Sequence, residues 1–203
     1  MTKRNLLIGV LAGVAMFFWG FISHVVLGLG DTGIRDLTGE EKILPTLREH
    51  IKESGFYFFP GEGGARSAGT KEQQEAATKA WQDKFKAGPW GILVYHPEGT
   101  TPMSPGQLGR QLLTDVVLGL LMAFLLGNPA AGLTRFGPRV VFVAVIGLIA
   151  GIAVLVPYWN WYGFPANFTV ASLADQLIAF CVAGVVLASL IKPTAPVSAT
   201  QTT

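Results

Sequence analysis

Four long apolar runs restrict the fold of this chain more than any other feature. They lie at about 6–28, 107–127, 139–157 and 169–191. Each is close to the roughly 20 residues that an α-helix needs to cross a bilayer. The mean hydropathy is +0.45 and only 14% of the residues are charged, against roughly 25% in soluble domains. The sequence therefore predicts an all-α membrane protein built on a four-helix transmembrane bundle.

The first apolar run begins directly after the basic sequence MTKR, as a signal peptide would. It is too long for the apolar region of a signal peptide, which spans roughly 7–15 residues, and no small-residue cleavage site follows it. Residues 1–29 are therefore predicted to form an N-terminal transmembrane anchor helix that is not removed.

The polar residues gather between the first two apolar runs. Eleven of the 13 acidic residues and nine of the 15 basic residues lie between 31 and 105. Residues 30–106 are predicted to form a small extracytoplasmic α+β cap, and residues 107–191 the other three transmembrane helices. The tail at 192–203 is rich in Pro, Ser, Thr and Ala, and is predicted to be disordered in the cytoplasm.

Two helices and two strands are expected in the cap. Thr38 and Glu41 fit a capping box for a first helix, which should kink or restart at Pro45. The second helix, at 71–87, has an apolar side and an i,i+4 pair of Glu75 with Lys79. The aromatic sequence GFYFFPG and the sequence GILVYHPEG are typical of short strands. Their pairing stays open, because a βαβ unit and a hairpin both fit.

Basic residues predict how the bundle is oriented. Short cytoplasmic loops of membrane proteins carry an excess of Lys and Arg. With four spans, five basic residues and no acidic residue fall on the side of the termini: Lys3, Arg4, Arg135, Arg139 and Lys192. Both termini are therefore expected in the cytoplasm, with the cap and the aromatic sequence PYWNWYGF on the outer side.

Three polar residues inside the apolar runs form the candidate site. His24, Asp115 and Asp175 each lie in the outer third of a predicted span, roughly 6–12 Å below the outer boundary. The two aspartates are the only acidic residues outside 31–105. Five further residues are near enough in depth to join them, namely Arg110, Gln111, Trp159, Asn160 and Gln176. Of these, Gln111, Gln176 and Trp159 are assigned to the predicted pocket. We expect an outward-facing polar pocket, covered by an aromatic loop at 157–168.

Small residues predict which helix faces pack together. In the spans they recur at the helical spacing that lets two backbones approach closely. In the first span the small residues share a face with His24. The predicted packing residues are Gly9, Gly13, Gly20, Gly119, Gly147, Gly151 and Ala179.

Three hypotheses explain the polar residues. They can fix helix register by hydrogen bonds, form an ion or proton site, or hold a metal or cofactor. One His and two carboxylates suit a divalent metal, but no local motif such as H-x-x-x-H supports a metal site, and no second span carries a His for haem. Cys181 is the only cysteine, which excludes an intrachain disulfide and multi-cysteine zinc sites. No cofactor is predicted.

The motifs and the net charge favour a non-enzymatic membrane function. No P-loop, dinucleotide fingerprint or nucleophile motif is present, so an enzyme is disfavoured, and a net charge of +2 gives no support for a nucleic-acid partner. The first hypothesis is a non-enzymatic accessory or self-associating subunit of a membrane complex, with a protein partner or a second copy in the bilayer. The alternative is a small carrier or sensor of a cation, proton or lipophilic ligand that uses the polar pocket.

Four aromatic motifs carry a resemblance to known sequences. The motifs WGFISH, GFYFFPG, GPWGILVY and PYWNWYGFP resemble those of a group of small bacterial inner-membrane proteins whose function is not assigned. The similarity runs through most of residues 15–190. It implies a bacterial inner membrane, in which the predicted extracytoplasmic cap would be a periplasmic domain. It implies no activity, and no catalytic residue is carried over from it.

Overall fold

The chain folds into two compact units in the computed structural model, which describes residues 1–63, 69–128 and 132–193. The first unit, here called the bundle, comprises Met1–Arg35 and Thr101–Thr203. The second, here called the insert, is Asp36–Thr100. The predicted disorder of the tail, from residue 194 on, lies outside the described residues, as do residues 64–68 and 129–131.

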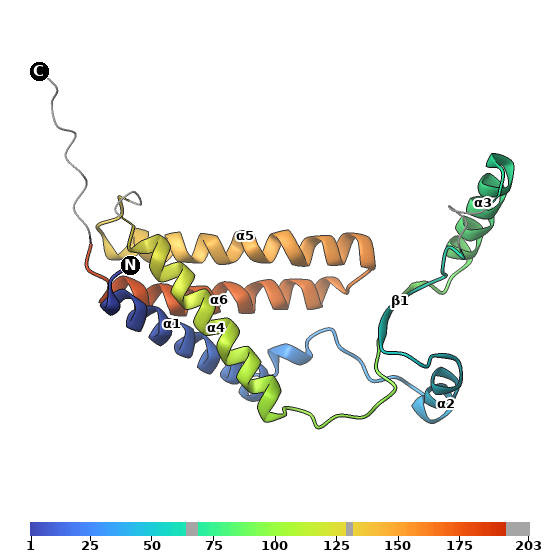
Figure 1. Cartoon of the computed structure of the whole chain (residues 1–203), viewed down its shortest axis with the longest axis horizontal. Helices are drawn as coiled ribbons and strands as arrows, with labels where there is room; N and C mark the ends of the chain where they lie inside the picture. The colour runs from blue at the N-terminus through green and yellow to red at the C-terminus, as the bar shows by residue number, and fades with distance from the viewer. Residues whose placement is uncertain (64–68, 129–131, 194–203) are drawn as a thin grey trace, which may run out of the picture. The chain divides into compact units, whose positions relative to one another are not determined.

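Four helices of the bundle are long and apolar enough to cross a membrane (Figure 1). They are α1 (Lys3–Phe21), which continues as a π-helix (Ile22–Val26), α4 (Pro105–Leu126), α5 (Phe136–Tyr162) and α6 (Ala166–Leu190). The four predicted apolar helices are therefore present, and their length and composition are consistent with a helical multi-pass membrane protein.

Side chains at the helix starts explain two of the boundaries. The Thr2 hydroxyl accepts a hydrogen bond from the Asn5 amide at the start of α1. At α4, Ser104 and Gln107 form a reciprocal capping box, and Pro105 occupies the first helical position, where its missing N–H costs nothing. The second span therefore starts two residues before the predicted boundary.

The aromatic segment after residue 157 is helical, and the prediction of a loop at 157–168 was wrong. Helix α5 passes through Pro157 and ends only at Tyr162, where Gly163 adopts a left-handed conformation with φ of 72°. A proline costs one backbone hydrogen bond near a helix end, whereas left-handed glycine is the usual helix terminator. The connection to α6 is therefore only Gly163–Pro165, and the rings of Tyr158, Phe164 and Phe168 pack on one another across it.

The helices of the bundle pack in the order α5, α6, α1, α4, with each helix antiparallel to the next (Figure 1). The start of α1 and the end of α6 lie at the same end of the bundle (Figure 1). There the Arg4 guanidinium donates to the Leu190 carbonyl at 2.8 Å, which joins the start of α1 to the end of α6. This arrangement fits an even number of membrane crossings.

Glycines allow the closest helix contacts. A Cβ at Gly13 would clash with the backbone of Asp115 and Val116, and a Cβ at Gly119 with the backbone of Gly9 and Gly13. On the other side of the bundle, Gly147 lies against Phe180, and Gly151 against Leu173. Ala179 packs beside the core. Gly20 and Gly28 have open space instead, so the predicted common face with His24 does not extend along the whole first span.

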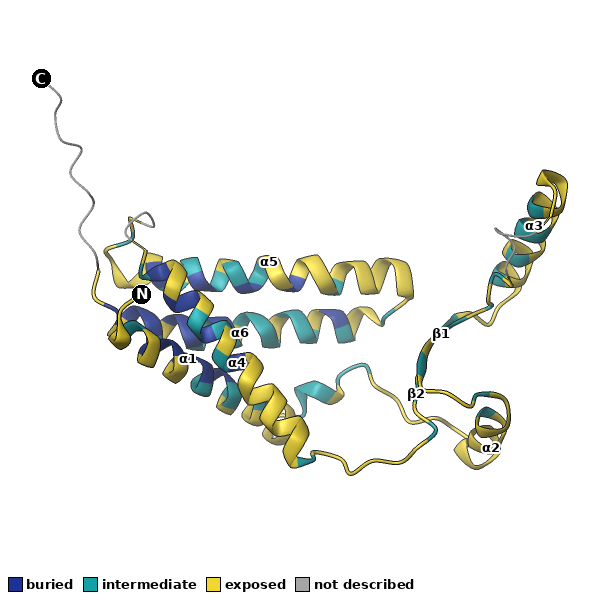
Figure 2. Cartoon of the chain, in the orientation of Figure 1, coloured by how far each residue is buried: buried dark blue, intermediate teal, exposed yellow. Residues whose placement is uncertain are grey.

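The tightest core lies at the end of the bundle that holds the termini (Figure 2). Its buried side chains include Ile8, Ala12, Met122, Val143 and Leu187. Arg139 is also buried there, at 2% exposure. Its Nη1 donates to the Ala188 carbonyl at 3.0 Å, whereas Nε and Nη2 have no hydrogen-bond partner among the residues that the structure describes. Arg139 and Arg4 thus both cap the last turn of α6, where the helix dipole favours positive charge.

The insert contains the predicted helices and strands, and the structure decides how the strands pair. Strand β1 (Gly55–Phe59) is antiparallel to β2 (Gly91–Tyr95), with Tyr57 opposite Leu93. Helix α3 (Lys71–Ala87) connects them, and α2 (Glu40–His50) precedes β1. Neither open alternative was right as it stood, because the pair is antiparallel yet joined through a helix.

Aromatic side chains hold the insert together. The Trp81 indole donates to the Pro60 carbonyl at 2.9 Å, and the Phe85 ring stacks on Phe58 and Trp90. No residue of the insert is fully buried within the described ranges 36–63 and 69–100. Its stability therefore rests on a few half-buried aromatic contacts.

Two local predictions in the insert were wrong. Helix α2 starts after Gly39, which has a φ of 75° and provides no side-chain cap, so Thr38 stands one residue too early for a capping box, and the helix continues through Pro45. Lys79 pairs with Asp83 at 2.9 Å instead of Glu75. The Lys79 ammonium lowers the pKa of the Asp83 carboxyl by a hydrogen bond and by charge attraction.

Candidate functional site

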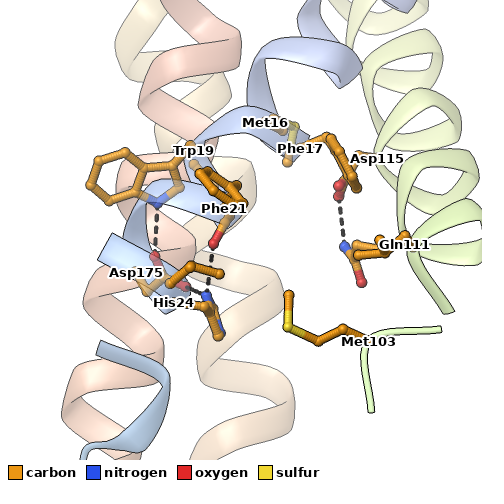
Figure 3. Close-up of a pocket in the computed structure, with 13 residues that line it drawn as sticks. Met16, Phe17, Trp19, Phe21, His24, Met103, Gln111, Asp115 and Asp175 are labelled. Atoms are coloured by element: carbon orange, nitrogen blue, oxygen red, sulfur yellow. Dashed lines mark hydrogen bonds and ion pairs between the residues drawn. The ribbon is translucent and has the colours of Figure 1, made fainter. Parts of the chain in front are cut away.

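One pocket collects most of the predicted polar residues. It is a cavity of about 320 Å³ between α1, α4 and α6, with Met103 from the segment before α4 on its rim (Figure 3). Met16, which is 4% exposed, lines the pocket and also belongs to the core. The cavity therefore lies next to the tightly packed part of the bundle, where α1 contacts both α4 and α6.

Asp175 occupies one side of the pocket, together with two residues of the first span (Figure 3). The Trp19 indole N–H donates to Asp175 Oδ1 at 2.7 Å. His24 Nδ1 lies 3.8 Å from Asp175 Oδ2, which is ion-pair range but longer than a hydrogen bond. These contacts tie α6 to the end of α1.

Two groups of the first span contact Nδ1 of the His24 ring. Nδ1 is 3.2 Å from the Gly20 carbonyl and 2.8 Å from the Ser23 hydroxyl. Nδ1 donates to the Gly20 carbonyl in one tautomer and accepts from the Ser23 hydroxyl in the other. The His24 side chain is 57% exposed.

Local backbone geometry positions the histidine. The Leu27 amide donates to the Ile22 carbonyl at 2.9 Å, five residues back, which makes residues 22–26 a π-helix. Single π-turns of this kind are frequent at functional sites. The wider turn brings Trp19 and His24 to the same side of the helix, although they are five residues apart. Gly30 then lies against the His24 ring, and a Cβ there would clash with it.

Asp115 and Gln111 form the other side of the pocket (Figure 3). The Gln111 amide donates to Asp115 Oδ1 at 3.0 Å. Asp115 is 6% exposed, and among the described residues its Oδ2 has no hydrogen-bond donor. The one hydrogen bond of this carboxylate therefore comes from its own helix, one turn earlier.

Two predicted pocket residues lie elsewhere. The Gln176 side chain donates to the Gly147 carbonyl on α5 at 3.0 Å. Adjacent residues on a helix point about 100° apart, so Gln176 faces α5 while Asp175 faces α1. Trp159 is on α5, which contributes no lining residue, and 49% of it is exposed. The aromatic segment is helical and does not cover the pocket.

Several lining residues were not among the predicted site residues. Trp19 is the most informative of them, because an indole N–H inside an apolar span needs a hydrogen-bond acceptor. Its position five residues before His24 is a signal that the sequence itself carries. Phe17, Phe21, Leu108 and Met103 supply apolar walls, and nothing distinguishes them in the sequence from lipid-facing residues.

The metal hypothesis receives no support from this geometry. Within the described ranges, no three His, Cys, Asp or Glu side chains lie close enough to share a metal ion. His24 and Asp175 are neighbours, whereas Asp115 lies with Gln111 on the opposite side (Figure 3). Comparison with known proteins gives no further guide, because no family model, curated protein or solved structure matches this chain.

Proposed function

We propose that this protein binds a small lipophilic ligand in the pocket between α1, α4 and α6, as a non-enzymatic carrier or sensor. One observation carries the proposal. Acidic residues from two different helices, Asp115 and Asp175, open on a single cavity whose other walls are mostly apolar. Apolar walls with a few convergent polar groups are typical of small-molecule sites, and 320 Å³ is near the lower end of their usual size.

A purely structural role explains Asp175 better than Asp115. Asp175 accepts a hydrogen bond from another helix, which is what a residue fixing helix register would do. Asp115 accepts one only from Gln111 on its own helix and so links no helices. An ionisable residue inside a membrane segment is costly and is by default a functional one. Asp115 therefore favours ligand binding.

A role as an accessory or self-associating subunit stays a prediction. Its main motivation was the number of small-residue faces. Within the bundle these faces are largely occupied, since Gly9, Gly13, Gly119 and Gly147 all contact neighbouring helices of the same chain. They supply no separate argument for a partner.

The proposed location is a bacterial inner membrane, with both termini in the cytoplasm and the insert in the periplasm. Two observations support it. The basic residues Arg4 and Arg139 lie at the end of the bundle that holds the termini, and the four motifs described above resemble those of inner-membrane proteins. In this orientation the pocket lies toward the periplasmic side.

The test is a variant that fills the cavity. Gly20 lines the pocket and has open space at its Cβ position, so Gly20→Leu should occupy the cavity without disturbing the helix contacts. Gly109→Leu is the matched control, because Gly109 also lies in a candidate span with open space at its Cβ but does not line the pocket. Native mass spectrometry after gentle extraction reports any bound small molecule and any copurifying subunit.

We expect extra mass from a small molecule on the wild type and on Gly109→Leu, and its loss in Gly20→Leu. Equal ligand mass on all three proteins would place the ligand outside the pocket. Copurification of larger subunits without a small molecule would instead favour the accessory role.

A further inference from the structure

The pocket presents hydrogen-bond acceptors more than donors. The Trp19 indole N–H is already donated to Asp175, and one amide N–H of Gln111 to Asp115. Each carboxylate keeps one oxygen without a hydrogen bond among the described residues, since Asp175 Oδ2 is 3.8 Å from His24. A ligand that fits these groups has to bring donors of its own.

The charged residues of the pocket lining also favour a ligand that donates hydrogen bonds. The lining contains two carboxylates and no Lys or Arg, and His24 is the one lining residue able to carry a positive charge. His24 is adjacent to Asp175, so Asp115 is left without a cationic neighbour in the lining. A buried carboxylate is stable as an anion only when it is paired, so the charges of the lining disfavour an anionic ligand and favour a cationic one.

The walls distinguish an organic cation from a metal ion. Beside Asp115 the lining offers few oxygens, whereas Phe17, Phe21, Met16 and Leu108 provide aromatic and aliphatic surface. Metal cations such as Mg²⁺ and Ca²⁺ require about six oxygen ligands. An ammonium group needs fewer acceptors, gains from nearby aromatic faces, and can carry a hydrocarbon chain that buries against apolar walls.

We infer that the ligand of this pocket is a lipophilic primary ammonium compound whose charged head pairs with Asp115. This inference rests on the proposed function. The ammonium donates to Asp115 Oδ2 and to the side-chain oxygen of Gln111, and its hydrocarbon lies along the aromatic and methionine side chains. Asp175, held by Trp19 and His24, shapes the opposite wall and does not bind the head.

The experiment uses the full chain in nanodiscs of zwitterionic phosphatidylcholine, with radiolabelled decylamine as the probe. Equilibrium dialysis against empty nanodiscs separates binding to the protein from partition into lipid. Competition by unlabelled decylamine and by decan-1-ol is measured on the wild type. These two competitors have the same alkyl chain and differ in the charged head, so this part needs no variant.

We expect decylamine to compete and decan-1-ol to fail. Asp115→Asn should weaken decylamine binding by about tenfold or more, since a charge-assisted hydrogen bond is lost. Gly109→Leu, outside the pocket lining, is the control and should leave the affinity unchanged, whereas Asp175→Asn alters the opposite wall and should cost less affinity than Asp115→Asn. Asp115→Glu keeps the charge and should retain most of the binding.

Three outcomes would overturn the inference. Equal competition by decan-1-ol, with both amphiphiles lost in Gly20→Leu, would leave a pocket for neutral lipophiles, so that the proposed function stands and the ammonium assignment fails. A larger loss of decylamine affinity in Asp175→Asn than in Asp115→Asn would show that the ammonium group pairs with Asp175 and not with Asp115. If neither decylamine nor decan-1-ol binds above the level of empty nanodiscs, the ammonium inference fails, and the proposed binding of lipophilic ligands in this pocket loses its support as well.

Discussion

At the scale of single residues, a few glycines decide how close the helices come and where Asp115 lies. The backbone of α1 at Gly13 lies against the backbone of α4 at Asp115 and Val116. No side chain fits between them. The position of the candidate ligand-binding carboxylate therefore depends on a residue of another helix that has no functional group of its own.

Gly13→Ala should destabilise the bundle by about 1–3 kcal/mol, because the added Cβ forces two helix backbones apart. Gly20→Ala should be neutral or stabilising by up to about 1 kcal/mol, since alanine is the better helix former and the space there is open. Denaturant unfolding in detergent, followed by circular dichroism, compares the two variants. Equal stability would show that α1 and α4 do not pack through Gly13.

At the scale of elements, the insert illustrates how little packing holds a small unit together. Its two strands form one antiparallel pair, and isolated pairs are marginally stable. The additional contact comes from α3, which packs Trp81 and Phe85 against residues at the ends of the strands. The aromatic residues of this helix should therefore carry most of the stability of the insert.

Trp81→Ala should unfold the insert, with a cost of about 2 kcal/mol or more from the lost ring contacts and the lost bond to the Pro60 carbonyl. Trp161→Ala is the control, because Trp161 is 73% exposed. Hydrogen exchange with mass spectrometry should show faster exchange in α3 of the first variant and unchanged exchange in α1 and α6. Faster exchange in the bundle helices as well would mean that the two units do not unfold separately.

At the scale of the whole molecule, four spans and adjacent ends make one topological prediction. The start of α1 and the end of α6 are joined by the bond between Arg4 and the Leu190 carbonyl, so they should lie on the same side of a membrane. The insert follows the first candidate span and precedes the second, so we expect it on the opposite side.

Single cysteines in a Cys181→Ala background test this topology. Thr2→Cys and Lys192→Cys should be protected from a membrane-impermeant maleimide in intact cells, whereas Glu98→Cys in the insert should be labelled after passage through the outer membrane. All three should react once the inner membrane is permeabilised. Labelling of the insert together with either end before permeabilisation would contradict the four-span arrangement.

The sequence by itself determined the elements whose causes are local. Apolar length produced the four spans, aromatic and β-branched runs the two strands of the insert, and helical periodicity α3. It also identified His24, Asp115 and Asp175, because an ionisable group in an apolar run is visible without a structure. Its local errors came from backbone conformations at Gly39 and Gly163, where left-handed glycines and not side chains set the helix boundaries.

Only the tertiary structure decided which of these residues meet. Depth along a span says nothing about rotation around it, so Gln176 was expected in the pocket but faces α5, whereas Trp19 was overlooked but binds Asp175. The order of helices in the bundle determines that α5 contributes nothing to the cavity. Helix order and rotation arise from close glycine contacts between distant segments, and these contacts come into being only when the helices pack.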